Sequence, residues 1–204
     1  MKRNKAIAVT KLFTVLCKNP SNPKAYWATL RLLAGKSREK SIKLFEESET
    51  GKRVLEQNLS LLSTMKNLDI SKKDSVAEYY DIFCKYWGIE RQAIEKEFQF
   101  DGRKPRNTKE VLLQRQIAYH DLIHVILGYD ATLKGEMQVV MFHFGQSRNW
   151  GFVLIALSIG WKYISSPYLM WKAYQRGKTT MRFETLDWET ILNMNINEVK
   201  RMFA

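Results

Sequence analysis

The sequence has few residues that break helices and few that cross-link a chain. Its 204 residues include only four Pro and ten Gly, so it lacks the frequent turn signals of β-sandwiches and barrels. The two cysteines, Cys17 and Cys84, lie far apart, which argues against a disulfide framework and a cysteine-rich metal knot. With many Leu, Lys, Glu and Met residues, the composition predicts an all-α fold, a single helical domain over residues 1–204.

A membrane-spanning run is also lacking. The longest stretch without charge covers residues 149–161 and ends at Lys162, whereas a spanning helix needs about 20 apolar residues. We expect this stretch to form a buried core helix or the wall of a lipid-binding cavity. The N-terminus begins with basic and then apolar residues, but Lys11 interrupts the apolar run and no clear cleavage site follows. We therefore expect an amphipathic first helix, not a signal or transit peptide.

Acidic residues are nearly missing from the first part of the chain. The formal net charge is +12, and residues 1–44 contain eleven Lys or Arg and one acid, Glu39. Such a surface attracts anionic lipid or nucleic acid, although a merely solvated basic face would look the same. Because no nucleic-acid-binding module is recognisable, we expect an anionic membrane surface as the partner, and no nucleic acid.

Helical patterns cover most of the chain. Asn107, with Glu110 three residues later, is typical of a capping box, and the helix it begins continues to Gly128, a typical C-terminal stop. A second long helix is predicted to start near Thr132. The loop is clearest at residues 100–105. The remaining predicted helices cover residues 6–18, 24–34, 38–48, 51–65, 74–87 and 89–98, with two short helices within residues 168–204.

Histidine is scarce, and its three positions are clustered. His120 and His124 are four residues apart, so on a helix they lie about 40° apart on one face, and Asp121 lies about 100° from His120. The same face carries Leu113 and Ile117, which marks it as a core stripe. Histidines on a buried face need partners, because an unpaired buried polar group costs about 1–3 kcal/mol.

The next helix provides the expected partner. If the chain turns near Asp130 into an antiparallel hairpin, Glu136 faces His124, because each lies six residues from the turn. We therefore predict a divalent metal bound by His120, Asp121, His124 and Glu136. Nitrogen and oxygen donors suit zinc first, with iron, cobalt, manganese or magnesium as alternatives.

The third histidine lies further along the second helix. His143 shares the Glu136 face but sits about 10 Å beyond it along the helix axis. This distance excludes direct ligation and leaves open a pocket role or a satisfied core histidine.

Rival motifs fit less well. Zinc peptidases place a Glu after the first His of HExxH, where this sequence has Asp121. Phosphohydrolases with a His-Asp pair need an upstream His, and residues 1–119 contain none. No phosphate-binding Gly loop and no plausible Ser-His-Asp order is present.

The metal motif resembles that of a known family. The segment HDLIH at residues 120–124, followed after eleven residues by Glu136, is similar to the signature of the coenzyme Q biosynthesis protein 4 family. Arg115, Gly128 and Gly135 stand in a similar context. The resemblance extends from the turn near residue 20 to residues 199–203. It departs where family members commonly carry a Thr-Phe-Gly segment, here Ser-Val-Ala at residues 75–77, and where they tend to have a second Arg, here Ile117.

The resemblance implies a function. Members of this family are all-helical peripheral membrane proteins of ubiquinone biosynthesis that bind a divalent metal, commonly zinc, beside a cavity for a polyprenyl chain. They are associated with C1 decarboxylation, with hydroxylation, of a polyprenylated hydroxybenzoate, in a complex with other quinone-biosynthesis proteins. On this basis we interpret the chain as a metal-dependent lyase, cytoplasmic and peripheral on the inner face of a membrane. A non-catalytic scaffold that binds a prenyl lipid, with a structural metal, is the alternative, and a homodimer is left open.

Overall fold

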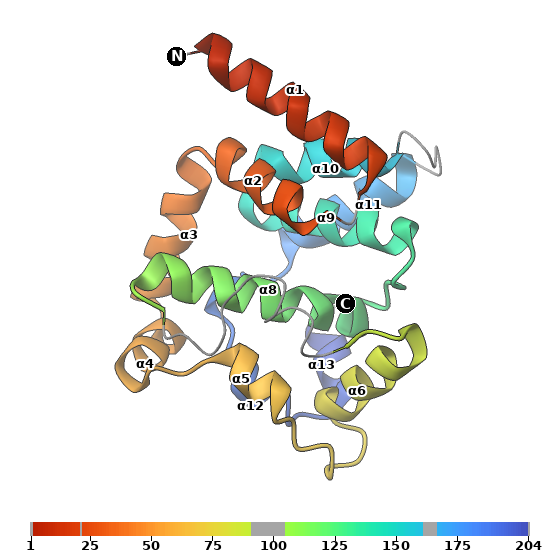
Figure 1. Cartoon of the computed structure of the whole chain (residues 1–204). Coiled ribbons are helices and arrows are strands. Elements are labelled where there is room, and N and C mark those ends of the chain that lie inside the picture. Colours follow the sequence, from red (N-terminus) through yellow and green to blue (C-terminus); the bar gives the residue numbers. More distant parts are fainter. Residues whose placement is uncertain (1, 21, 91–104, 161–166, 204) are drawn as a thin grey trace. The chain divides into compact units, whose positions relative to one another are not determined.

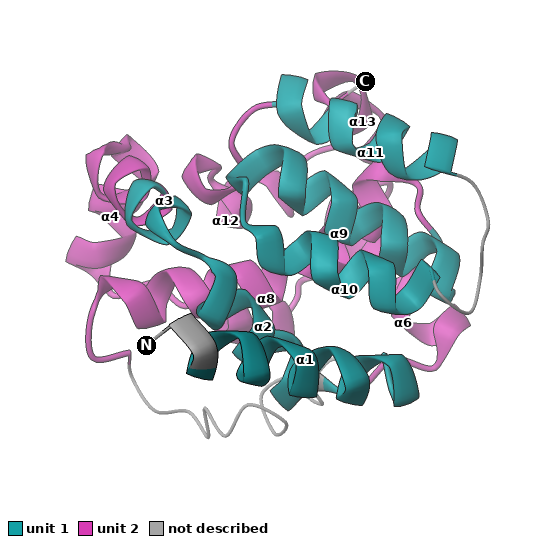
Figure 2. Ribbon diagram, turned by 90° about the horizontal axis from the view of Figure 1, so that it is seen from above, with its two compact units in different colours: residues 1–40, 130–180 teal, residues 41–129, 181–204 magenta. Residues whose placement is uncertain are grey.

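The computed structural model describes residues 2–20, 22–90, 105–160 and 167–203, and these form helices and no strand. The all-α prediction is confirmed. None of the described helices is long and apolar enough to cross a membrane. The chain divides into two compact units, residues 1–40 with 130–180 (unit 1) and residues 41–129 with 181–204 (unit 2) (Figure 2). Residues 91–98 of the predicted helix 89–98 and residues 100–104 of the predicted loop lie outside the described residues.

Unit 1 is a bundle of helices around an aliphatic core (Figure 1). Its central helix α9 packs against α10 and α11, and α10 packs against α1 and α2. Asn22 caps α2 through its side chain, and Thr132 caps α9. The helices are α1 Lys2–Lys18, α2 Pro23–Leu33, α9 Leu133–Ser147, α10 Trp150–Gly160 and α11 Pro167–Thr179. The core residues include Leu16, Leu30, Met137, Val140, Phe152, Ile155 and Ile159.

Two glycines set the distance between α9 and α11. A Cβ on Gly145 would lie 2.3 Å from the Tyr174 carbonyl oxygen, and a Cβ on Gly177 would lie 2.1 Å from the Phe142 carbonyl oxygen. The backbones therefore touch where neither helix has a side chain. A hydrogen bond also joins the two helices at this crossing, because the Gln146 Nε2 on α9 donates to the Gly177 carbonyl on α11 at 2.7 Å. This crossing fixes α9, the helix that carries Glu136.

Unit 2 is built around α8, which packs against α5, α6 and α13. Tyr119 on α8 stacks on Trp188 with ring centroids 5.4 Å apart, and Phe183 packs edge-on against Trp188. The described elements are α4 Glu49–Gln57, α5 Leu61–Lys66, α6 Val76–Trp87, α8 Thr108–Leu127, the 3₁₀ turn Phe183–Thr185, α12 Trp188–Ile191 and α13 Ile196–Met202; α3, Lys36–Glu47, includes the boundary between the units.

A buried ion pair ties the C-terminal segment to α8. Arg115 has a side chain only 2% exposed, and its two terminal nitrogens donate to the two carboxylate oxygens of Glu189 at 2.5 and 3.1 Å. Arg53 pairs with Asp187 at 2.6 Å next to it. A two-pronged Arg–carboxylate contact fixes direction as well as distance, so this pair sets the position of residues 187–189 against α8.

The predicted run through residues 51–65 is two helices. Gly51 lies inside α4 and does not begin it; Ser48 is the cap. Asn58 then takes the left-handed conformation with φ 52°, and Ser60 caps α5. Asn tolerates this conformation better than most residues. The helix therefore ends at Asn58, although the apolar pattern of the sequence continues past this residue.

Gly177→Ala is expected to destabilise unit 1 strongly. Its Cβ would meet backbone atoms, which cannot rotate away, so a cost of about 3 kcal/mol is expected. Chemical denaturation followed by circular dichroism measures it. Gly160→Ala on α10 is the matched control, since its Cβ would meet only the Met137 sulfur at 3.9 Å. Equal midpoints for the two variants would contradict the close-crossing explanation.

Candidate metal site

Helix α8 presents two histidines from one stable segment. The Asn107 side chain accepts from the Glu110 amide at 3.1 Å, as the capping pattern predicted. The helix then runs from Thr108 to Leu127 and ends at Gly128, whose φ of 72° is the left-handed stop that glycine favours. Between these two ends, His120 and His124 lie one turn apart.

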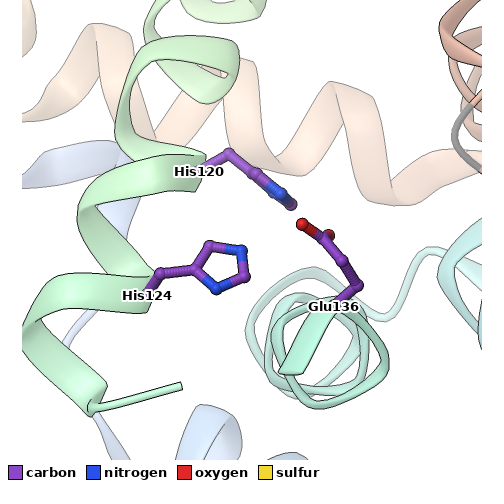
Figure 3. Close-up of side chains that lie close together, drawn as sticks. All are labelled: His120, His124 and Glu136. Atoms are coloured by element: carbon purple, nitrogen blue, oxygen red, sulfur yellow. The ribbon is translucent and has the colours of Figure 1, made fainter. Parts of the chain in front are cut away.

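Three of the four predicted ligands come together. One ligand atom each of His120, His124 and Glu136 lie within 4.8 Å of one another, and the side chains point toward a common centre (Figure 3). Donors bound to one zinc ion at 2.0–2.1 Å stand about 3.3 Å apart. Separations of up to 4.8 Å leave room for one divalent cation among these donors, and two imidazoles with one carboxylate are donor types that zinc takes.

The hydrogen-bond contact of His124 suits metal binding. This side chain is buried, and its Nδ1 lies 3.3 Å from the Tyr129 carbonyl oxygen. A carbonyl can only accept, so Nδ1 donates in this contact, and in the neutral imidazole Nε2 is then the nitrogen with the lone pair that binds a metal. Metal-binding histidines commonly use their second nitrogen in this way. Phe83 stacks against the ring with centroids 5.6 Å apart, which holds its orientation.

Asp121 lies outside the three-residue group. Its Oδ2 accepts a hydrogen bond from the Tyr80 hydroxyl at 3.4 Å. Burial raises the pKa of Tyr80, and the Asp121 charge raises it further, so the phenol stays protonated and donates to the carboxylate. Ligation by Asp121 stays a prediction, and it requires this carboxylate to turn.

Glu136 follows a tightly built turn. The Thr132 amide donates to the Asp130 carboxylate at 3.0 Å, and the Thr132 hydroxyl contacts the same oxygen. A Cβ on Gly135 would lie 1.8 Å from the Asp130 carbonyl oxygen, so the turn can close only with glycine there. Tyr26 lies nearby, since burial and then the Glu136 charge raise its pKa.

His143 is accounted for by packing. It is 8% exposed, and its ring stacks on Phe152 with centroids 4.9 Å apart and planes 9° apart. It does not belong to the metal-binding group found among the described residues. These contacts favour the core role among the two that the sequence left open, and a pocket role stays a prediction.

The sequence matches a family model over residues 18–204, that of the coenzyme Q (ubiquinone) biosynthesis protein Coq4. The chain belongs to the Coq4 family. It therefore has a role in ubiquinone biosynthesis. None of the curated proteins matches the sequence.

A solved structure shares the fold. It is the crystal structure of a candidate ubiquinone biosynthesis protein from Nostoc punctiforme PCC 73102, and it matches 99% of this chain and 97% of its own with a TM-score of 0.64 and 12% identity. At this identity the likeness shows the fold alone.

Residues that carry the Coq4 resemblance have physical roles in the structure. Gly128 takes the left-handed conformation that ends α8. Gly135 allows the close turn before Glu136, and Arg115 holds Glu189. Tyr80 and Phe83 were not predicted as neighbours of the motif, although both lie in the helix predicted at residues 74–87.

Gly135→Ala is expected to weaken metal binding without removing a ligand. The added methyl would collide with the Asp130 backbone, so the first turn of α9 must shift and carry Glu136 with it. We expect the dissociation constant for Zn²⁺ or Co²⁺ to rise about tenfold or more. Competition with a chromophoric chelator measures this constant. Gly160→Ala is again the control, and an unchanged constant for Gly135→Ala would show that the turn does not position Glu136.

Proposed function

We propose that this Coq4-family chain is a divalent-metal enzyme that removes the C1 carboxylate of a polyprenylated hydroxybenzoate, with hydroxylation at that carbon. The observation that carries the proposal is the donor group of His120, His124 and Glu136. Membership of the family supports the pathway, and the family resemblance of the HDLIH segment supports the reaction.

The number of donors favours catalysis over a purely structural metal. Structural zinc sites are closed by four protein ligands, whereas catalytic sites commonly combine three protein ligands with an open position. The described residues offer three donors here. The same two-histidine, one-carboxylate set also serves non-haem Fe(II) oxygenases, so zinc, our first choice, and iron both suit it.

The protein side chains have defined tasks in this proposal. His120, His124 and Glu136 hold the cation, and the Tyr129 carbonyl keeps the Nε2 lone pair of His124 available. When bound, the cation supplies a Lewis acid that attracts the substrate carboxylate and phenolic oxygen. Simple decarboxylation breaks the C1–carboxyl bond, and the electron pair left on the ring takes up a proton. Hydroxylation at the same carbon would insert one oxygen atom of dioxygen, and it would require a redox-active metal and a two-electron reductant that takes the second oxygen atom to water.

Membrane contact is the second part of the proposal. The substrate's prenyl tail is insoluble in water, and the basic residues 1–44 suit an anionic lipid surface. We therefore place the protein peripherally on the inner, cytoplasmic face of a membrane, with other quinone-biosynthesis proteins as partners. A homodimer stays a prediction.

A non-catalytic scaffold that presents a prenyl lipid is the alternative function. It would use the same metal as a structural element, and binding of Asp121 as a fourth ligand would favour it by closing the coordination shell. The hydrogen bond from Tyr80 that engages Asp121 favours the enzyme.

One tightly bound divalent metal per chain is expected, and His124→Ala and Glu136→Ala should each lose it. The helices should remain, because unit 1 has an aliphatic core of its own and the metal is not its sole support. Metal content by plasma mass spectrometry and helix content by circular dichroism check both points. His143→Gln is the matched control with full occupancy expected. Full occupancy in both ligand variants would exclude the site.

Turnover is expected from protein loaded with the right metal. The protein is reconstituted with zinc, iron, cobalt, manganese or magnesium and incubated with a short-chain prenylated hydroxybenzoate, with and without dioxygen. Carbon dioxide release and product mass are measured. Product should form with at least one metal and disappear in Glu136→Ala. Lipid binding without turnover under every condition would favour the scaffold.

A further inference from the structure

The excess positive charge of the chain belongs to one unit. Residues 1–40 and 130–180 contain sixteen Lys or Arg and three acidic residues, a net charge of +13. Unit 2 contains seventeen Lys or Arg and eighteen acidic residues, a net charge of −1. Unit 1 thus has the electrostatic character of a domain that associates with an anionic partner; residues 1–40 contribute +9 of this charge and residues 130–180 contribute +4.

Unit 1 also exposes an apolar helix face. The eleven residues of α10 include no charged side chain. Its inner side packs in the core. On its outer side Trp150 is 64% exposed and Leu157, two turns later on the same face, is 52% exposed, with Val153 and Leu154 half-buried between them. Single exposed apolar residues are ordinary on protein surfaces, but a continuous helix face that includes a Trp needs a cause.

An aromatic ladder continues this face onto α11. Its rings are those of Trp150, Phe144, Tyr174 and Trp171, with successive centroids 5.2, 5.5 and 5.4 Å apart. Trp171 is 58% exposed, and Tyr168 one turn before it is 66% exposed. Tryptophan and tyrosine rings with one apolar side and one polar atom are the residues enriched at the level of lipid headgroups.

Arg148 lies within this ladder. Its guanidinium stacks over the Tyr174 ring at 5.0 Å and over Phe144 at 5.9 Å, and it donates to the Tyr174 hydroxyl. The residue has a φ of 58°, a left-handed conformation that is costly for a long side chain. No carboxylate of the described residues pairs with it. A cation held among exposed rings, with donors to spare, suits a phosphate group.

We propose that the aromatic ladder and the outer face of α10 insert into the headgroup region of an anionic phospholipid bilayer, with Arg148 bound to a lipid phosphate. The apolar face accounts for insertion, and the charge of unit 1 accounts for the preference for anionic lipid. A protein partner would need acidic groups to match the charge and also an apolar groove to receive the ladder, whereas a bilayer interface has both properties. This surface adds an apolar contact to the membrane contact of the proposed function, for which residues 1–40 supply most of the charge, and it is independent of the metal and the reaction.

The test uses the full-length protein and vesicles of phosphatidylcholine alone or with phosphatidylglycerol. We expect the double variant Trp150→Ala, Trp171→Ala to lower the vesicle partition coefficient about tenfold or more, since each ring contributes buried apolar area. Arg148→Gly tolerates the same backbone conformation and should weaken binding to anionic vesicles while leaving the weaker binding to neutral vesicles unchanged. The matched control is Ile82→Ala, Tyr86→Ala on unit 2, where the two side chains are 54% and 78% exposed.

Each outcome has a defined meaning. Reduced binding in the Trp variant with normal binding in the control and unchanged metal content supports the proposal. Equal partition of the wild type and the Trp variant overturns it, and so does equal loss in the control. Concentration-dependent self-association that the Trp variant abolishes, with vesicle binding intact, also overturns it and marks the ladder as an interface between copies. Metal content and turnover report separately on the proposed enzyme.

Discussion

The burial of His124 is the constraint on which the site depends. An imidazole that is 2% exposed needs polar partners on both nitrogens, since an unsatisfied one costs about 1–3 kcal/mol. The Tyr129 carbonyl takes one nitrogen, and this carbonyl is in place because Gly128 ends α8 in the left-handed conformation. The other nitrogen is left for the group that includes Glu136. The end of α8 at Gly128 and the metal donor His124 are therefore coupled through the backbone of two adjacent residues, Gly128 and Tyr129.

Local signals explain why much of this site could be predicted from sequence. Asn107 and Thr132 cap helices within three residues of themselves, and the four-residue spacing of His120 and His124 defines one face whatever surrounds it. Asp121 is different. Its position about 100° around the helix from His120 directs it off the shared face, and the structure gives it Tyr80 as a partner. Tertiary packing decides which neighbour such a flanking carboxylate contacts, and the residue spacing carries no information about that packing.

Contacts between segments that are distant in the sequence could not be predicted, for the same reason. Arg115 and Glu189 are 74 residues apart, and no periodicity connects them. The charge of unit 1 was visible only in part, because this unit combines residues 1–40 with residues 130–180, and the second segment looks unremarkable by itself. The end of α4 at Asn58 was missed because the apolar pattern continues across it, while a left-handed Asn is recognised only from its backbone angles.

The absence of a side chain at two glycines of α9 matters both for the packing of this helix and for the proposed metal site. Gly145 lets this helix touch α11, and Gly135 lets its first turn close over Asp130. Both glycines cost conformational entropy in a helix, about 0.5–1 kcal/mol each relative to alanine. At Gly145, the packing of α9 against α11 offsets this entropic cost. The close turn at Gly135, one residue before Glu136, offsets it by fixing the first turn of α9, so the backbone and not side-chain packing sets the position of this ligand.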